Sequence, residues 1–264
     1  MKVYLTILAS FFFVIAIYAQ KEITTEDLWK NYTFLDKTVP GFNFLKDGKH
    51  YTRLQNNTIK KYDLTTGDFV EDILIGEDIK GKEGFSGVIN SYSFSEDEHR
   101  IMIKSEVKSI YRRSTVAKFH VYDSDSKELI SVWKGSGKIG YATFNPNADL
   151  VAFVHKNNLY YTDLTFGETV QITKDGEQNE IINGSTDWVY EEEFSFAKAF
   201  YWSPDGNKLA FIRFDESDVK EFTMTKYEDQ LYPVYETFKY PKVGENNADV
   251  SAHVYYLNEK DIRK

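Results

Sequence analysis

The sequence predicts an all-β fold, and three observations point to it. Aromatic residues are abundant, since 19 Tyr, 20 Phe and 4 Trp make up 16% of the 264 residues, and flat side chains favour the pleated faces of strands. An aromatic strand end, a polar tight turn and an apolar strand recur in this order along the chain. From Val39-Pro40-Gly41 onward the patterning is that of short strands.

The composition excludes several classes of function. The net charge of -9 lacks the surplus of Lys and Arg that phosphate binding needs, so nucleic acid is not an expected partner. The chain has no cysteine, which excludes a disulfide scaffold, a cysteine nucleophile and a thiolate zinc site. With only 5 Pro and 15 Gly the sequence is not of low complexity, which favours a folded protein.

The first element, residues 1–19, has the pattern of a secretory signal peptide. A basic start at Met1-Lys2 precedes an apolar run from Val3 to Tyr18, and the small residue Ala19 follows it. The run reaches only about 24 Å at ~1.5 Å per residue, less than the ~30 Å core of a bilayer. We expect cleavage after Ala19 and an exported protein, periplasmic, on the outer surface or secreted; an uncleaved N-terminal anchor is the alternative.

Residues 20–40 are expected to form a helical and extended N-terminal segment. Thr24 to Lys30 predicts a short helix, because a hydroxyl cap is followed by the acids Glu26 and Asp27 in the first turn.

Residues 41–264 carry repeats of strands. The aromatic residue before the recurring turn stands at Phe94, Phe144 and Trp202, spacings of 50 and 58 residues. A second phrase follows each strand pair, as Tyr62-Asp63-Leu64, Tyr122-Asp123 and Thr162-Asp163-Leu164. Repeats of about 40–50 residues with four short strands are typical of propeller blades.

This periodicity predicts an incomplete β-propeller of four-stranded blades. We count about four to five blades, the fifth being cut short after Tyr255-Tyr256-Leu257. A β-sandwich with accidental similarity between its strands is the alternative.

The usual signatures of catalysis are missing from the sequence. It contains no Gly-x-Ser-x-Gly elbow, no glycine loop for phosphate and no metal-binding spacing of histidines, so we expect no catalytic residue, metal or cofactor. The five histidines are scattered: His50, His99, His120, His155 and His253.

An acidic segment, Asn183 to Glu193, interrupts the blade pattern. The consecutive residues Glu191, Glu192 and Glu193 are poor strand material, since like charges repel. A short helix or loop would let neighbouring carboxylates converge on one point, where an ammonium group suits them. A solvated acidic loop is the alternative, and the flanking Trp188 and Tyr190 count against it. A glycosidase pair is disfavoured, because its two carboxylates must stand about 5–10 Å apart across a bond.

A second candidate lies between two strand runs, at Lys108 to Thr115. It contains Arg112 and Arg113, and a guanidinium forms fork-like hydrogen bonds to carbonyl or carboxylate oxygens. A solvated hairpin tip is the alternative.

The run Asp187-Trp188-Val189-Tyr190-Glu191-Glu192-Glu193 resembles the double-glutamate motif of dipeptidyl peptidase IV, in the prolyl oligopeptidase clan of serine peptidases. The similarity continues through residues 200–207, 209–211 and 240–244, and upstream through Tyr111-Arg112-Arg113-Ser114. The resemblance covers most of the mature chain and is to the bacterial exported type.

The resemblance implies a fold and a site. In that family an eight-bladed propeller caps an α/β-hydrolase domain. The enzyme releases dipeptides whose second residue is Pro or Ala. Glu192 and Glu193 would hold the free N-terminus of a peptide substrate and Arg112 its carbonyl, with Asp187, Trp188 and Tyr190 supporting the site and Glu191 structural. A homodimer is a further implied partner.

The hydrolase domain of the family, with its Ser, Asp and His, has no counterpart in residues 1–264. We therefore expect an N-terminal, substrate-anchoring portion that is inactive by itself and that works with a C-terminal hydrolase domain missing here. The alternative is a non-catalytic propeller module that binds peptides or proteins.

Overall fold

A computed structural model of the protein describes residues 22–36 and 41–264, and the chain divides into two compact units, residues 1–41 and 42–264. The expected signal peptide lies outside the described residues. None of the helices in the described residues is long and apolar enough to cross a membrane.

The first unit contains the predicted helix, α2 (Thr25–Trp29). Thr24 caps it, because the Thr24 hydroxyl accepts a hydrogen bond from the Asp27 amide at 3.1 Å. The Asp27 carboxylate accepts in return from the Thr24 amide at 3.3 Å, which completes a capping box. The hydroxyl and acid pattern of the sequence thus has its physical basis in this cap.

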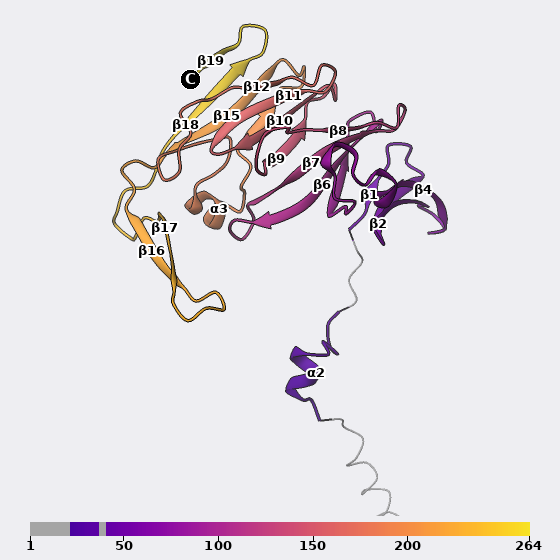
Figure 1. Ribbon diagram of the computed structural model, residues 1–264, viewed down its shortest axis with the longest axis horizontal. Coiled ribbons are helices and arrows are strands. Elements are labelled where there is room, and N and C mark those ends of the chain that lie inside the picture. The colour runs from indigo at the N-terminus through magenta and orange to yellow at the C-terminus, as the bar shows by residue number, and fades with distance from the viewer. Residues whose placement is uncertain (1–21, 37–40) are drawn as a thin grey trace, which may run out of the picture. The chain divides into compact units, whose positions relative to one another are not determined.

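The second unit contains four successive antiparallel sheets (Figure 1). The first sheet has β1 (Asn43–Phe44), β2 (His50–Gln55), β3 (Thr58–Asp63) and β4 (Phe69–Ile75). The second has β5 (Ser91–Phe94), β6 (Arg100–Ser109), β7 (Thr115–Asp123) and β8 (Leu129–Ser131). The third has β9 (Gly140–Phe144), β10 (Leu150–His155), β11 (Asn158–Asp163) and β12 (Thr169–Gln171). Two 3-10 turns, η1 (Gly76–Ile79) and η2 (Lys82–Gly84), join the first sheet to the second.

The fourth sheet is larger and contains an insertion. Its strands are β13 (Ile181–Asn183), β14 (Phe200–Trp202), β15 (Lys208–Asp215), β18 (Asp249–Tyr256) and β19 (Asp261–Arg263). Between β13 and β14 lies the helix α3 (Trp188–Phe194). Between β15 and β18 the chain forms a separate two-stranded hairpin, β16 (Glu221–Lys226) and β17 (Val234–Lys239).

This insertion corrects the expectation of a fifth blade. Tyr255 pairs with Leu209 and Tyr256 with Lys208, so β18 belongs to the fourth sheet. The β16–β17 hairpin lengthens the connection between β15 and β18 of that sheet. Because of this insertion, the spacing along the sequence predicts a new repeat at β18 and β19, whereas both strands belong to the fourth sheet.

The recurring turn phrase joins β1 to β2, β5 to β6, β9 to β10 and β14 to β15. Its aromatic residue stands opposite the start of the next strand, as in the pairs Phe94–Ile101, Phe144–Val151 and Trp202–Leu209. The first sheet has the same arrangement at Phe44–Tyr51. The phrase therefore occurs once in every one of the four sheets.

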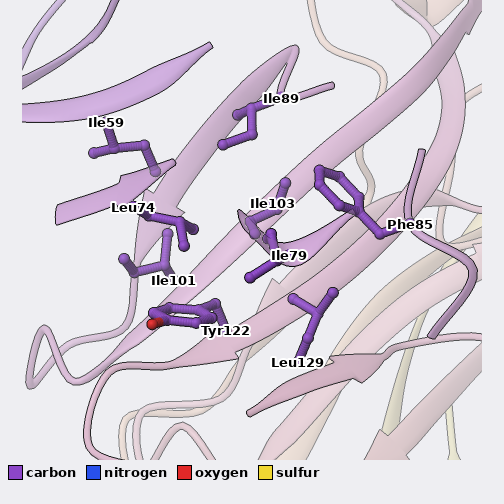
Figure 2. Packing of buried hydrophobic residues seen from close by; sticks show 9 residues of the cluster. All are labelled: Ile59, Leu74, Ile79, Phe85, Ile89, Ile101, Ile103, Tyr122 and Leu129. Carbon is purple, nitrogen blue, oxygen red and sulfur yellow. The ribbon is translucent and has the colours of Figure 1, made fainter. Parts of the chain in front are cut away.

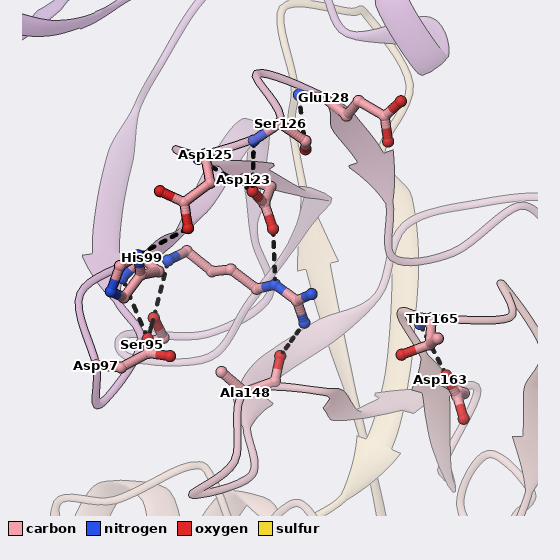
Figure 3. Close-up of polar contacts among 11 residues, drawn as sticks. Ser95, Asp97, His99, Asp123, Asp125, Ser126, Glu128, Ala148, Asp163 and Thr165 are labelled. Carbon is pink, nitrogen blue, oxygen red and sulfur yellow. Dashed lines mark hydrogen bonds and ion pairs between the residues drawn. The ribbon is translucent and has the colours of Figure 1, made fainter.

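The second phrase ends the third strand of the first three sheets. Asp123 accepts hydrogen bonds from the amides of Asp125 and Ser126 at 3.1 and 3.0 Å, which holds the turn into β8 (Figure 3). Asp63 and Asp163 each accept two amide bonds in the same way. These aspartates explain the repeat chemically, because their side chains close the turn.

The core consists of apolar clusters between successive sheets. One cluster joins the first two sheets, with Ile59 and Leu74 against Ile101 and Ile103 (Figure 2). The neighbour Met102 faces the opposite way, into a cluster shared with Val151 and Phe153 of the third sheet. Ala152 and Val154 then pack with Phe200 and Leu209 of the fourth. Because alternate residues of a strand face opposite sides, each inner sheet packs on both neighbours, and the four sheets form a partial β-propeller.

Candidate functional site

The acidic segment folds as a short helix, the first of the two conformations that the sequence allowed. Asp187 caps α3, since its carboxylate accepts a hydrogen bond from the Tyr190 amide at 2.8 Å. The helix ends at Ser195, whose φ of 63° lies in the left-handed region. β13 leads into this segment and β14 leads out of it, so the fourth sheet fixes both of its ends.

The two aromatic residues of the motif attach α3 to its surroundings. The Tyr190 ring lies 4.9 Å from that of Phe214, a fully buried side chain of β15, in an edge-on arrangement. The Trp188 ring lies 4.6 Å from that of Tyr240, just beyond β17. Both side chains are half-buried. They position the helix backbone from two directions.

Glu191 points into the protein. It is 1% exposed, and its Oε1 accepts hydrogen bonds from the backbone amides of Arg113 and Ser114 at 2.6 and 2.8 Å. Those amides belong to the turn between β6 and β7, 77 and 78 positions away in sequence. Glu191 thus connects the acidic helix to the arginine turn of the second sheet.

The structure brings Arg112 and Glu192 together. Arg112 Nε lies 3.2 Å from Glu192 Oε2, and the two side chains are 72% and 19% exposed. Glu193 is exposed and has no hydrogen-bond or ion-pair partner in the described part of the chain. Arg113 turns instead to the end of α3, where its Nη2 donates to Ser195 Oγ at 2.9 Å. A free carboxylate therefore follows directly after the arginine-paired one.

A cavity of about 400 Å³ lies behind this surface. Trp188 and Glu191 of α3, Tyr111 of the turn, and Glu216 and Lys239 at the ends of β15 and β17 contribute to its lining. The carboxylates of Glu192 and Glu193 and the guanidinium of Arg112 do not line it. The cavity and the Arg112–Glu192 pair are therefore separate features of the site.

Glu216 is the ionisable group of the cavity that sequence reasoning missed. Burial and, next, the Asp187 carboxylate raise the pKa of Glu216 to about 7, while the Lys239 ammonium opposes the rise. Burial also raises the pKa of Asp187, against the hydrogen bond from the Tyr190 amide. No sequence signal distinguishes Glu216, since it stands beside Asp215, Ser217 and Asp218 in a polar run.

The histidines are not singled out as a site by the sequence. In residues 22–36 and 41–264 no three His, Cys, Asp or Glu side chains are grouped so as to hold a metal ion. His120 is 1% exposed within β7, and its Nε2 lies 3.1 Å from the Glu83 carbonyl. The chemistry of this surface is thus that of carboxylates beside a guanidinium, which can bind an ammonium group and a carbonyl oxygen together.

Fold and site together define the class of this protein: a partial β-propeller whose fourth blade carries an acidic helix facing an arginine turn of the second blade. The sequence profile described as "Dipeptidyl peptidase IV (DPP IV) N-terminal region" matches residues 95–264, more than half of the chain. The chain belongs to this family.

Individual relatives agree with the family match. The crystal structure of Porphyromonas gingivalis dipeptidyl peptidase 4 superposes with a TM-score of 0.84 at 34% identity, over 92% of this chain and 35% of that one. Dipeptidyl peptidase 4 of Felis catus is 32% identical over 77% of this chain and 26% of its own length. The human prolyl endopeptidase FAP is 30% identical over 86% of this chain and 29% of its own length. The chain thus spans about a third or less of the length of these relatives.

Proposed function

We propose that the chain is the substrate-anchoring propeller region of an exported dipeptidyl peptidase IV-like serine peptidase, which releases X-Pro or X-Ala dipeptides from peptide N-termini. The observation that carries this proposal is the placement of Glu192 beside Arg112, with the exposed Glu193 next in the sequence. The names of the relatives, dipeptidyl peptidase and dipeptidyl-aminopeptidase, support it. The catalytic triad would come from a C-terminal hydrolase domain, which we propose as a partner of this region.

The geometry suits the N-terminus of a peptide. An ammonium group offers three donors and one charge, so two neighbouring carboxylates satisfy it better than one. Glu192 is largely shielded from solvent at 19% exposure, which strengthens its interaction with a cation. Arg112 uses Nε for Glu192, so its other N–H groups remain for a substrate carbonyl. The two contacts together would place the second peptide bond at a fixed distance from the N-terminus.

Binding measurements with site variants test this proposal. Gly-Pro-amide is titrated into the protein by isothermal calorimetry, with Glu192→Gln, Glu193→Gln and Arg112→Ala as variants. Loss of one charged hydrogen bond costs about 1.5–3 kcal/mol, roughly a 10- to 100-fold rise in Kd. Glu168→Gln, an exposed carboxylate in the third sheet's last turn, is the matched control and should leave Kd unchanged. Equal affinities for all four variants would refute the anchoring role.

The alternative, a non-catalytic module that binds peptides or proteins, is separated by turnover. The protein, with any natural C-terminal continuation, is assayed on a Gly-Pro chromogenic substrate. Hydrolysis that disappears in Glu192→Gln supports the peptidase. Binding of Gly-Pro-amide without hydrolysis by the continued chain supports the module.

We also propose that the protein forms a homodimer. The described residues that support it are exposed apolar side chains on the β16–β17 hairpin, a kind of patch that marks interaction surfaces. They are Met224, Tyr227, Leu231, Tyr232, Val234 and Tyr235. Sedimentation velocity should then show a dimer that Leu231→Asp converts to a monomer, and a wild-type monomer would contradict the proposal.

A further inference from the structure

The turn between β6 and β7, residues 110–114, is joined to α3 by contacts of very different strength. The Arg112–Glu192 ion pair is exposed at its arginine end, at 72%. Such surface pairs contribute only about 0–1 kcal/mol, because solvent screens them and two long side chains must be ordered. This pair is therefore too weak to hold the turn in place by itself.

The contact of Glu191 is of another kind. A carboxylate that is 1% exposed is tolerated only when hydrogen bonds replace its hydration. Oε1 of Glu191 receives two such bonds, both from backbone amides of the turn, at 2.6 and 2.8 Å. Charge-assisted bonds of this type are among the strongest in proteins, and here they fix the main chain and not a mobile side chain.

Two further side chains, Tyr141 and Arg113, lie beside this contact. Burial and the nearby Glu191 carboxylate raise the pKa of Tyr141, a residue of β9. Arg113 adds a second link, from its Nη2 to Ser195 Oγ at 2.9 Å. Glu191 lies within α3 and Ser195 is the residue at its C-terminal end, so the turn is joined to the helix at two points.

We propose that Glu191 is a positioning residue: it fixes the backbone of residues 113 and 114 against α3 so that Arg112 stands beside Glu192. The two adjacent arginines then have different tasks, since Arg113 faces the helix end and Arg112 faces the ligand. The backbone contact stands independently of any ligand. Its consequence for peptide binding rests on the proposed function.

Hydrogen exchange tests the backbone contact directly. In Glu191→Ala the Arg113 and Ser114 amides lose their acceptor, and we expect their protection to fall about tenfold or more. Glu191→Gln keeps an acceptor oxygen without the charge, so it should restore part of that protection and remain folded. The matched control is Asn57→Ala, in a turn of the first sheet. The Asn57 side chain accepts a hydrogen bond from the Ile89 amide at 2.8 Å and donates one to the Gly87 carbonyl at 2.7 Å, so its removal breaks a similar link elsewhere. It should leave the Arg113 and Ser114 amides protected.

Two further measurements follow the same variants. Trypsin cleavage after Arg112 or Arg113 should accelerate about tenfold in Glu191→Ala, with no change in Asn57→Ala. The Kd for Gly-Pro-amide should rise in the order wild type, Glu191→Gln, Glu191→Ala, although Glu191 does not touch the ligand. Unchanged amide protection and cleavage in both Glu191 variants would overturn the positioning role. If the wild-type protein does not bind the peptide, the proposed function is overturned. The hydrogen-exchange result then still tests the backbone contact by itself.

Discussion

The cavity carboxyl Glu216 makes the stability of this protein depend on pH in a defined direction. The pKa of Glu216 is raised from 4.5 to about 7 in the folded protein. Burial is the main cause, followed by the Asp187 carboxylate and a weaker effect of Glu180, while the Lys239 ammonium lowers the pKa. The unfolded chain releases this proton near pH 4.5, whereas the folded chain keeps it until about pH 7. Below pH 4.5 both states are protonated and Glu216 costs nothing. Between the two values the folded state binds more protons, so the free energy of unfolding falls as pH rises.

The magnitude follows from the same values. A tenfold change in a proton-binding constant is worth about 1.4 kcal/mol, so the full effect above pH 7 is about 3 kcal/mol. Because Glu216 is only 7% exposed, solvent screens little of it. Glu216→Gln removes the titration and keeps the shape of the side chain. It should therefore be more stable than wild type at pH 8 by up to about 3 kcal/mol, and nearly equal to it at pH 4.5.

Urea unfolding of both proteins, followed by tryptophan fluorescence at pH 4.5, 6 and 8, measures this difference. Other titrating groups, such as Asp123 and His120, are common to both proteins and cancel in the comparison. A matched control is Glu168→Gln, which is exposed and should give no pH-dependent difference. A difference between wild type and Glu216→Gln that stays constant from pH 4.5 to 8 would refute the reasoning.

Three further predictions concern stability, each measured as the free energy of urea unfolding. Asp187→Ala removes the cap of α3 and should cost about 0.5–2 kcal/mol. Asp187→Asn keeps a capping side chain and should cost less. Equal losses of stability in the two variants would contradict the capping role. The Phe153 ring is fully buried between the second and third sheets, so Phe153→Ala should cost about 3–5 kcal/mol. Phe166 is 78% exposed, so Phe166→Ala should have almost no effect. Similar losses for both variants would show that the apolar cluster around Phe153 does not stabilise the sheets. Asp163→Ala removes two bonds to the turn after β11 and should cost about 1–3 kcal/mol, and an unchanged unfolding midpoint would argue against these bonds.

The fold could be predicted largely because its signals are local. The turn phrase ending at Phe94, Phe144 and Trp202 depends on residues that are adjacent in sequence, and the structure places each at the same point of a sheet. The cap of α2 at Thr24 is equally local. Four of the predicted four to five blades are present; the partial fifth was wrong because the β16–β17 hairpin separates strands of one sheet, and insertion length carries no information about pairing.

The site was harder to predict because its contacts join distant segments. The acidic run predicts a short helix or a loop, and its aromatic residues count against a solvated loop; the structure has the helix α3. The bonds from the Arg113 and Ser114 amides to Glu191 could not be foreseen, since backbone amides are the same in every sequence. Glu216 is buried in a cavity that α3 and the end of β17 also line, and nothing in its own polar neighbourhood indicates this.

The central claim, that this surface anchors a free peptide N-terminus, is tested most directly by removing the charge from the ligand. The Kd of the protein for Gly-Pro-amide is compared with that for N-acetyl-Gly-Pro-amide, which keeps both residues and lacks the ammonium group. We predict that the free peptide binds at least about tenfold more tightly, and that the difference disappears when Glu192 and Glu193 are both replaced by Gln. Equal affinity of the wild-type protein for the two peptides would contradict the claim.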